Sequence, residues 1–179
     1  MVRFFVTFIV LLAMLFGAEL TPWAQKYFVV PWTAALAAIS GWLASVMDPN
    51  IATMGKVIRS TANGFAVSIE AGCNGIEATI VLVAAIVAFP ASWRDRLVGL
   101  AAGIVAVQGL NVVRVISLFY LGQWSIRAFE WAHLYVWQAL IMLDVLVVWL
   151  IWVRLLPRDD DAHTRRGPPP GGAAVTVSG

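Results

Sequence analysis

The sequence predicts an all-α protein that crosses a membrane several times, and three observations support this prediction. Of the 179 residues, 61% are hydrophobic and only 12% are charged. A soluble domain cannot bury so much apolar surface while exposing so few charges. Apolar stretches recur along the chain, most of them near the roughly 20 residues that cross a bilayer as a helix. Nine tryptophans supply side chains suited to membrane interfaces.

The apolar stretches are expected to form about five hydrophobic helices. The first follows Arg3 and is predicted to be an uncleaved anchor helix, because no clear cleavage site follows it. One membrane-embedded domain is predicted over residues 1–156, followed by a disordered cytoplasmic tail over 157–179 that is rich in Pro, Gly and Asp. The expected helices cover residues 4–20, 29–47, 76–89, 97–121 and 134–156.

The second stretch, 29–47, is the weakest of the expected spans, because it contains Pro31, Ser40 and Gly41. If it crosses the membrane together with the first stretch, the N-terminus lies outside. If Arg3 instead marks an N-terminus on the inside, this stretch lies in the outer leaflet or re-enters from it. The small and polar residues favour the second arrangement slightly, and the sequence leaves both open.

A β-hairpin is predicted between the second and third stretches. Val57-Ile58 forms one strand, and alternating apolar residues from Phe65 to Ile69 form the other. Asn63-Gly64 between them is a strong hairpin signal. Open strands cannot satisfy their backbone groups in hydrocarbon, so the hairpin is expected on the outer face, directly before the helix that follows the cysteine.

Basic residues predict the orientation of the later helices. Arg94 and Arg96 lie between the third and fourth stretches, and Arg154 and Arg158 lie at the end of the fifth. The excess of Lys and Arg in cytoplasmic loops places both regions inside. The start of the third stretch, the end of the fourth and the start of the fifth then face outward, where aromatic residues of a loop at 124–131 suit the interface.

Cys73 is the only cysteine, so no disulfide can form within the chain. A lone cysteine is either an inert small hydrophobe or a reactive thiol. The sequence that follows fits a helix start, with Asn74 as N-cap and Glu77 at the third helical position. Gly75 keeps the surroundings of the thiol open. Cys73 is therefore expected at the outer mouth of the third helix.

Arg114 lies inside the fourth stretch, about 26 Å along the helix from residue 97 and a few Å below the outer surface. A charged side chain at this depth costs a few kcal/mol on insertion scales. On its own, Arg114 could extend its head to the outer headgroups. Asn111, one turn earlier, shares its helix face and could serve packing or orient the guanidinium. His133 opens the fifth stretch and, alone, could be an interfacial residue.

Taken together, the three residues indicate thiol chemistry at the outer face. A thiolate is the attacking form, and a helix N-terminus, an arginine and a histidine each favour it. Cys73 would attack a peptide carbonyl and His133 would give a proton to the leaving amine. Arg114, with the amide groups of Asn74 and Gly75, would stabilise the oxyanion. No metal, cofactor or nucleic acid is expected.

Two other functions remain open at this point. The chain could be a non-enzymatic membrane assembly or export subunit, in which Arg114 binds an anionic lipid or an acid of a partner helix and Cys73 is inert. A proton or ion pathway through Glu77, Arg114 and Asp144 is a weaker hypothesis, because Asp144 should lie near mid-bilayer while the others lie near one face.

The chain resembles the exosortase/archaeosortase family. The matching residues are Ala-Gly-Cys-Asn-Gly-Ile-Glu-Ala at 71–78, Asn-Val-Val-Arg at 111–114, and His133. The order and membrane placement of Cys, Arg and His agree, and the resemblance covers about residues 65–152. The Cys-Asn-Gly version of the first motif and the short chain are most similar to exosortase H.

The resemblance implies a membrane-embedded cysteine protease or transpeptidase of the bacterial cytoplasmic (inner) membrane, with its active site facing outward. Its implied substrates are exported proteins with a C-terminal sorting signal, made of a short IPTLxxWG-type motif, a transmembrane helix and a basic tail. Cys73 carries over as nucleophile, with Arg114 and His133 as its partners. The enzyme would sit among membrane lipids, and the acceptor of the cleaved protein is not implied.

Overall fold

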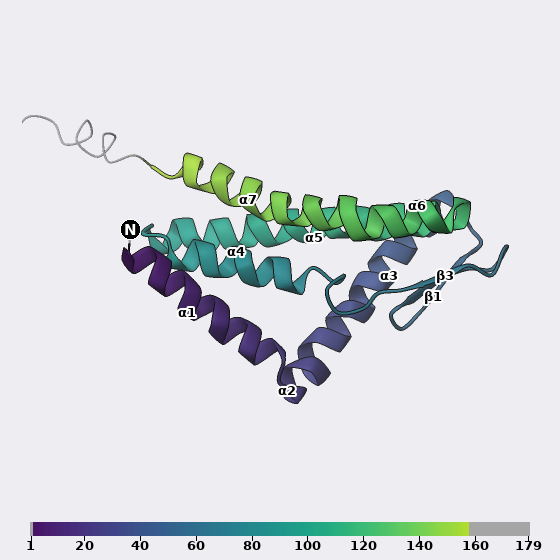
Figure 1. Cartoon of the computed structure of the whole chain (residues 1–179), viewed down its shortest axis with the longest axis horizontal. Helices are drawn as coiled ribbons and strands as arrows, with labels where there is room; N and C mark the ends of the chain where they lie inside the picture. The colour runs from purple at the N-terminus through teal and green to yellow at the C-terminus, as the bar shows by residue number, and fades with distance from the viewer. Residues whose placement is uncertain (1, 158–179) are drawn as a thin grey trace, which may run out of the picture.

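The computed structural model describes residues 2–157, which are mostly helical (Figure 1). The predicted tail therefore lies, apart from Pro157, outside the described residues. Within the described part of the chain, four helical stretches are long and apolar enough to cross a membrane, and Ile76–Ala88 is a shorter apolar helix. The expected polytopic all-α class with about five hydrophobic helices is confirmed. The four long stretches are Val2–Glu19, Pro22–Met47, Trp93–Trp124 and Ile126–Leu155.

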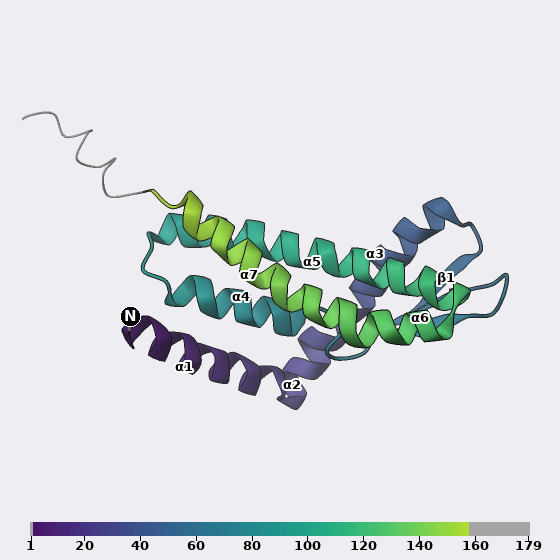
Figure 2. The same cartoon turned by 45° about the horizontal axis from the view of Figure 1, so that its top comes forward.

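Four helices lie side by side and form a bundle (Figures 1 and 2). The short helix α4 is central to it, since α1, α5 and α7 all pack on it. Leu82 and Ile86 of α4 are fully buried in the core against Val107 of α5 and Val145 of α7. The bundle helices are α1 (Val2–Glu19), α4 (Ile76–Ala88), α5 (Trp93–Trp124) and α7 (Trp137–Leu155).

The second apolar stretch does not return along the bundle. Near its start, Trp32 Nε1 donates a hydrogen bond to the Asn74 carbonyl at 3.2 Å, just before α4. Near its end, the Tyr120 hydroxyl donates to the Ala44 carbonyl at 3.3 Å, close to the last turn of α5. Both contacts lie at the same end of the bundle, and the stretch crosses that end obliquely (Figures 1 and 2). Its parts are α2 (Pro22–Ala24), the π-helical turn η1 (Gln25–Val29) and α3 (Val30–Met47).

The start of α1 lies at the opposite end of the bundle, where α4 turns into α5 (Figure 1). The Phe4 ring lies 6.0 Å from the ring of Phe89, the residue that ends α4. Arg3 therefore shares this end with Arg94 and Arg96. The sequence left two arrangements open for residues 29–47. In the structure this stretch stays at the end of the bundle opposite the N-terminus and does not run back along it.

The predicted hairpin is part of a three-stranded antiparallel sheet in the order β1-β2-β3. The β2–β3 turn contains Gly64 at φ +77°, and Phe65 N donates to Asn63 Oδ1 at 2.9 Å. The strand β1 was not predicted; a turn at Gly55, with φ +56°, joins it to β2. Ile58 and Ile69 pack the sheet region against α3 and α5. The strands are β1 (Ile51–Met54), β2 (Val57–Ser60) and β3 (Ala66–Ser68).

The predicted loop at 124–131 is wrong, because this region is helical. α5 continues to Trp124, and Ser125 alone separates it from α6 (Ile126–Trp131). The Ser125 hydroxyl accepts a hydrogen bond from Ala128 N at 3.4 Å and so caps the new helix. The π-helical turn η2 (Ala132–Val136) then joins α6 to α7. His133 consequently lies beyond the first turn of the last helical stretch, not at its start.

Candidate active site

Cys73 lies in a short loop between the sheet and α4, half-buried. Gly72 and Gly75 on either side have φ values of +82° and +73°, a left-handed conformation that glycine adopts without strain. Cys73 N donates to the Glu70 carbonyl at 3.0 Å, which closes the turn. The two glycines therefore let the chain bend sharply around the thiol.

The predicted helix cap is wrong in detail. Gly75, not Asn74, is the N-cap of α4, and no side chain caps it. Asn74 is fully buried, with its Oδ1 accepting from Ile76 N at 3.1 Å and its Nδ2 donating to Thr33 Oγ1 at 3.2 Å. Glu77 reaches further back than predicted, to accept from Gly72 N at 2.7 Å. Asn74 thus fastens the loop to α3, and Glu77 fixes the residue before the thiol.

Arg114 approaches the thiol from α5. Its Nη2 donates to Cys73 Sγ at 3.6 Å, and its side chain is only 2% exposed. Among the described residues, Nε and Nη1 of Arg114 have no hydrogen-bond partner. Arg114 lies about 32 Å along α5 from Trp93 at 1.5 Å per residue. This length is close to the thickness of a hydrocarbon core, about 30 Å, so the site lies at the border of the bilayer when Trp93 lies at the opposite one.

His133 approaches the same sulfur from the π-helical turn η2. Its Nε2 lies 3.9 Å from Cys73 Sγ, and its ring stacks on Phe129 with centroids 5.6 Å apart and planes at 8°. Its Nδ1 is buried and has no partner within the described part of the chain. The imidazole is therefore oriented by packing against Phe129, and no carboxylate among the described residues accepts a hydrogen bond from its Nδ1. Single π turns inside α-helices occur frequently at functional sites.

Asn111 does not contact the guanidinium of Arg114 by a hydrogen bond. Both atoms of its buried side-chain amide lack a partner within residues 2–157. Asn111 lies instead against the turn at Gly75, where an added Cβ would stand 3.0 Å from its Nδ2. The structure therefore places Asn111 at the loop that presents the thiol.

Gln108 contributes to the site and was not predicted. Its Nε2 donates to the Gly75 carbonyl at 3.1 Å and to Thr79 Oγ1 at 3.0 Å. Gln108, Asn111 and Arg114 follow one another at intervals of three residues and so share one face of α5. Extending the pattern of Asn111 and Arg114 by one turn would have found Gln108.

The electrostatic surroundings of Cys73 differ from the expectation. Burial raises the pKa of the Cys73 thiol, the Arg114 charge lowers it, and Glu77 and Glu70 raise it again, with a net shift above its ordinary value. The expected effect of Arg114 in favour of the thiolate is therefore present, but burial outweighs it in the free protein. The thiol is protonated at neutral pH, and a base must take its proton when it attacks.

Asp144, the acid expected near mid-bilayer on the last helix, forms no ion pair with Arg114. The described residues contain one ion pair, between Lys56 and Glu70, which is exposed. Within the same residues, no group of three or more His, Cys, Asp or Glu side chains could hold a metal ion. The functional groups that meet at this site are the Cys73 sulfur, the His133 imidazole and the Arg114 guanidinium.

The comparison with protein families agrees with this geometry. A model of the transmembrane exosortases, of the EpsH type, matches residues 2–151, which include Cys73, Arg114 and His133. No curated protein and no solved structure matches the chain. The family match together with the apolar helices indicates a multi-pass membrane protein of the protein-sorting transpeptidase class. The chain belongs to the transmembrane exosortase family.

Proposed function

We propose that this protein is a cysteine transpeptidase that cleaves the C-terminal sorting signals of exported proteins and transfers them to an acceptor. One observation carries the proposal. Cys73 Sγ lies 3.6 Å from Arg114 Nη2 and 3.9 Å from His133 Nε2, although the three residues come from three separate segments. A nucleophile, a base and a cationic hydrogen-bond donor at one point are the parts that acyl transfer needs.

In the first half of the reaction, the Cys73 thiol passes its proton to His133 Nε2 as Sγ bonds to the substrate carbonyl carbon. The carbonyl oxygen becomes an oxyanion, which the unpaired N–H groups of Arg114 stabilise. His133 then gives the proton to the departing amide nitrogen, and the C–N bond breaks. The products are an amine, on the membrane-bound remnant of the signal, and a thioester on Cys73.

In the second half, the acceptor amine or water attacks the thioester carbon. His133 takes a proton from this nucleophile, and the C–S bond breaks. The proton returns to the sulfur, which regenerates the thiol. Because burial raises the pKa of the Cys73 thiol, this sequence requires the base that His133 supplies, with Nε2 3.9 Å from Sγ.

Positively charged residues support an outward-facing site. Arg3, Arg94, Arg96 and Arg154 lie at or next to the helix ends that are remote from Cys73. The described residues carry as many basic side chains near Cys73, namely Lys26, Lys56, Arg59 and Arg127. The excess comes from Arg158, Arg165 and Arg166, which follow α7 in the sequence, and such an excess at cytoplasmic membrane borders puts the end of α7 inside. Cys73 then faces the outer side of the cytoplasmic membrane, where an exported protein arrives.

The proposed substrate combines a short motif, a transmembrane helix and a basic tail, with the IPTLxxWG-type motif expected of an exosortase H. This subtype rests on the Cys-Asn-Gly sequence at 73–75. A motif placed just before the substrate helix would lie at the bilayer border, which is the level of Cys73. The basic tail would remain on the cytoplasmic side.

The experiment is co-expression of the chain with a reporter that ends in such a signal, followed by measurement of the cleaved fraction. Cys73→Ala should abolish cleavage, and Cys73→Ser should reduce it to near the background. Val113→Ala, next to Arg114 but 53% exposed, is the matched control and should cleave normally. Normal cleavage by Cys73→Ala would reject the enzyme and favour the non-enzymatic assembly subunit.

A further inference from the structure

A groove of about 600 Å³ runs along the bundle between α1 and α7, with α4 as its floor. Figure 2 shows α4 between these two helices. One end of the groove is lined by Gly72 and Gly75, the two glycines that flank Cys73. The groove therefore begins beside the thiol and continues into the membrane-embedded part of the protein.

The other end of the groove is closed by aromatic side chains. The Phe4 ring stacks on Trp149 with centroids 6.3 Å apart and contacts Phe89 edge-on at 6.0 Å. These contacts join the start of α1 to α7 and to the end of α4. Along α7, the lining extends from Gln138 to Trp149. At 1.5 Å per residue this is about 17 Å, or roughly 11 residues of helix.

The lining changes in character along this length. Near the thiol it contains Glu77, Gln138 and the backbone of the two glycines, together with the ring of Phe16. Further away it is aliphatic and aromatic; its members there include Val81, Ala85, Met142, Val145 and Leu146. A ligand that fits this gradient is polar where it meets Cys73 and apolar beyond that point.

We propose that the groove binds the first three turns of the apolar helix of the sorting signal, a proposal that rests on the proposed function. A segment that leaves Cys73 into hydrocarbon must be helical, because its backbone groups find no water there. Small side chains on the floor, Ala78 and Ala85, let another helix approach α4 closely. The groove begins at Gly72 and Gly75, on either side of the residue that the proposed function makes the nucleophile, so the segment that directly follows the cleaved bond is the one placed to enter it.

The length of the groove limits how much of the signal helix the protein can recognise. The groove is as long as about 11 helical residues, fewer than the roughly 20 that span the bilayer, and at about 600 Å³ it receives one face of the helix. The remainder of the signal helix and its basic tail extend past the aromatic closure at Phe4 and Trp149 and contact lipid. Recognition should therefore depend on the N-terminal half of the signal helix and tolerate changes in its C-terminal half.

Cysteine cross-linking tests the occupant directly. In a Cys73→Ala background the chain has no other cysteine and the reporter is not cleaved. Met142→Cys places a thiol in the groove, and Leu143→Cys places one at the same depth of α7 but outside the lining; the native side chains are 70% and 53% exposed. The reporter carries one cysteine in the first two turns of its helix, and a mild oxidant forms the disulfide.

The proposal expects an adduct with Met142→Cys at least ten times as abundant as with Leu143→Cys. Equal adducts at the two positions, or none at Met142→Cys, would overturn it. Moving the reporter cysteine to the last turn of its helix should remove the preference, and persistence of the preference there would also count against the proposal. This assay needs no cleavage, so its outcome is separate from that of the proposed function.

Filling the groove gives a second, independent readout. Val81→Trp should lower reporter cleavage at least ten-fold, while maleimide labels Cys73 at the unsubstituted rate. Val105→Trp, on a surface of α5 where the valine is 73% exposed, is the control and should cleave normally. Unchanged cleavage by Val81→Trp overturns the groove proposal, whereas absence of cleavage by the unsubstituted chain rejects the proposed function and leaves the cross-link to decide the groove.

Discussion

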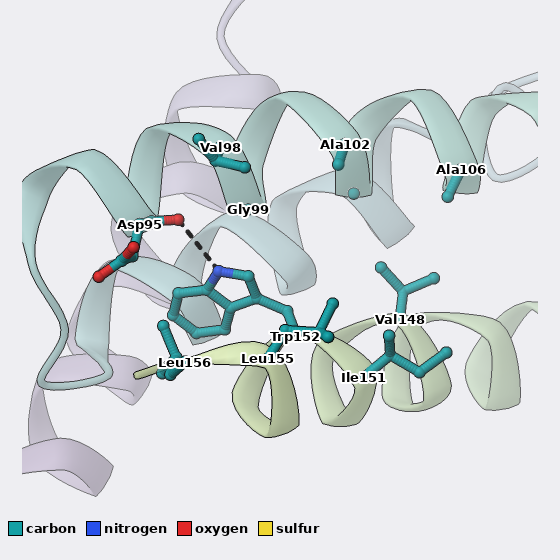
Figure 3. Close-up of a pocket in the computed structure, with 11 residues that line it drawn as sticks. Asp95, Val98, Gly99, Ala102, Ala106, Val148, Ile151, Trp152, Leu155 and Leu156 are labelled. Carbon is teal, nitrogen blue, oxygen red and sulfur yellow. Dashed lines mark hydrogen bonds between the residues drawn. The ribbon is translucent and has the colours of Figure 1, made fainter. Parts of the chain in front are cut away.

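The two ends of the helical bundle bury different kinds of side chain. At the Trp93 end, α5 and α7 line an open pocket of about 320 Å³ whose lining is mostly aliphatic (Figure 3). Trp152 fills the space beside Gly99 and donates Nε1 to the Asp95 carbonyl at 3.0 Å (Figure 3). The aromatic rings of Phe89 and Trp152, 5.7 Å apart, close this end. The Trp152 indole N–H is thus satisfied, and only Trp149 Nε1 and Arg96 Nε are buried at this end without a partner within residues 2–157.

The Cys73 end instead buries Asn74, Asn111 and Arg114. Most of the buried side-chain atoms that lack a partner within residues 2–157 lie here, including both amide atoms of Asn111 and two nitrogens of Arg114. Each unsatisfied group costs about 1–3 kcal/mol. The comparison indicates that the Trp93 end is packed for stability. The Cys73 end holds unpaired buried polar groups at a cost in stability, as the proposed active site would require. Substitutions at the two ends should therefore separate activity from stability.

The largest expected effect follows the removal of His133. Without its base, the protonated Cys73 thiol cannot readily attack, and His133→Ala should lower the rate of reporter cleavage by about 10²- to 10⁴-fold. The thermal unfolding temperature in detergent should change little. Leu134→Ala, the next residue and 60% exposed, is the control and should keep full activity. Full activity of His133→Ala would show that His133 is not the general base.

Replacing Arg114 should also separate the two properties. Arg114→Met should lower cleavage by about 10²- to 10³-fold, the cost of losing an oxyanion donor. Its unfolding temperature should stay level or rise, since an apolar side chain replaces a poorly paired buried charge. A fall in stability together with unchanged cleavage would make Arg114 a structural residue.

Arg114→Met should also change how the alkylation rate of Cys73 depends on pH. Burial holds the pKa of the Cys73 thiol above its ordinary value, and the Arg114 charge opposes this shift. Since the thiolate is the reactive form, removal of the charge should move the alkylation profile of Cys73 to higher pH and slow alkylation at neutral pH. Maleimide labelling of the two proteins across a pH series measures this shift.

A smaller effect is expected at the turn beside the thiol. Gly75→Ala adds a Cβ at φ +73°, within 3.0 Å of the side chains of Gln108 and Asn111. Strain of this kind costs about 1–3 kcal/mol, so both the unfolding temperature and cleavage should fall. Gly17→Ala is the matched control, because nothing lies within 4 Å of its added Cβ, and it should not destabilise α1. Equal behaviour of the two variants would show that the left-handed turn is unimportant.

The smallest effect is expected at the Trp93 end. Trp152→Phe removes the hydrogen bond to the Asp95 carbonyl while keeping an aromatic ring, and should cost about 1 kcal/mol of stability. Cleavage per folded molecule should be unchanged, which unfolding and activity measurements on the same preparation would reveal. A loss of activity larger than the loss of folded protein would contradict the statement that the Trp93 end contributes only to stability.

The helices were predictable from the sequence because apolar length alone selects them. The β2–β3 turn was predictable because Asn63-Gly64 has a specific local conformation. β1 was missed, since the turn at Gly55-Lys56 carries a weaker signal and most of the residues from Ile51 to Met54 are exposed. The oblique path of α3 depends on its contacts with Asn74 and Tyr120, which lie far away in the sequence.

Three members of the candidate site were predictable, whereas Gln108 and the detailed geometry were not. Cys73, Arg114 and His133 were selected by depth and order along the chain. The π-helical turn that aims His133 and the left-handed N-cap at Gly75 arise from tertiary packing. The direction of the pKa shift of Cys73 depends on how deeply the loop is buried, which no local pattern encodes.

The most direct test of this account is the isolation of the acyl-enzyme. Unsubstituted protein, incubated with a sorting-signal reporter and quenched in acid, should give an adduct of chain and cleaved reporter that hydroxylamine releases. Mass spectrometry should place the adduct on Cys73, and His133→Ala should accumulate less of it. Cleavage that proceeds with no thioester, or an adduct on another residue, would contradict the account.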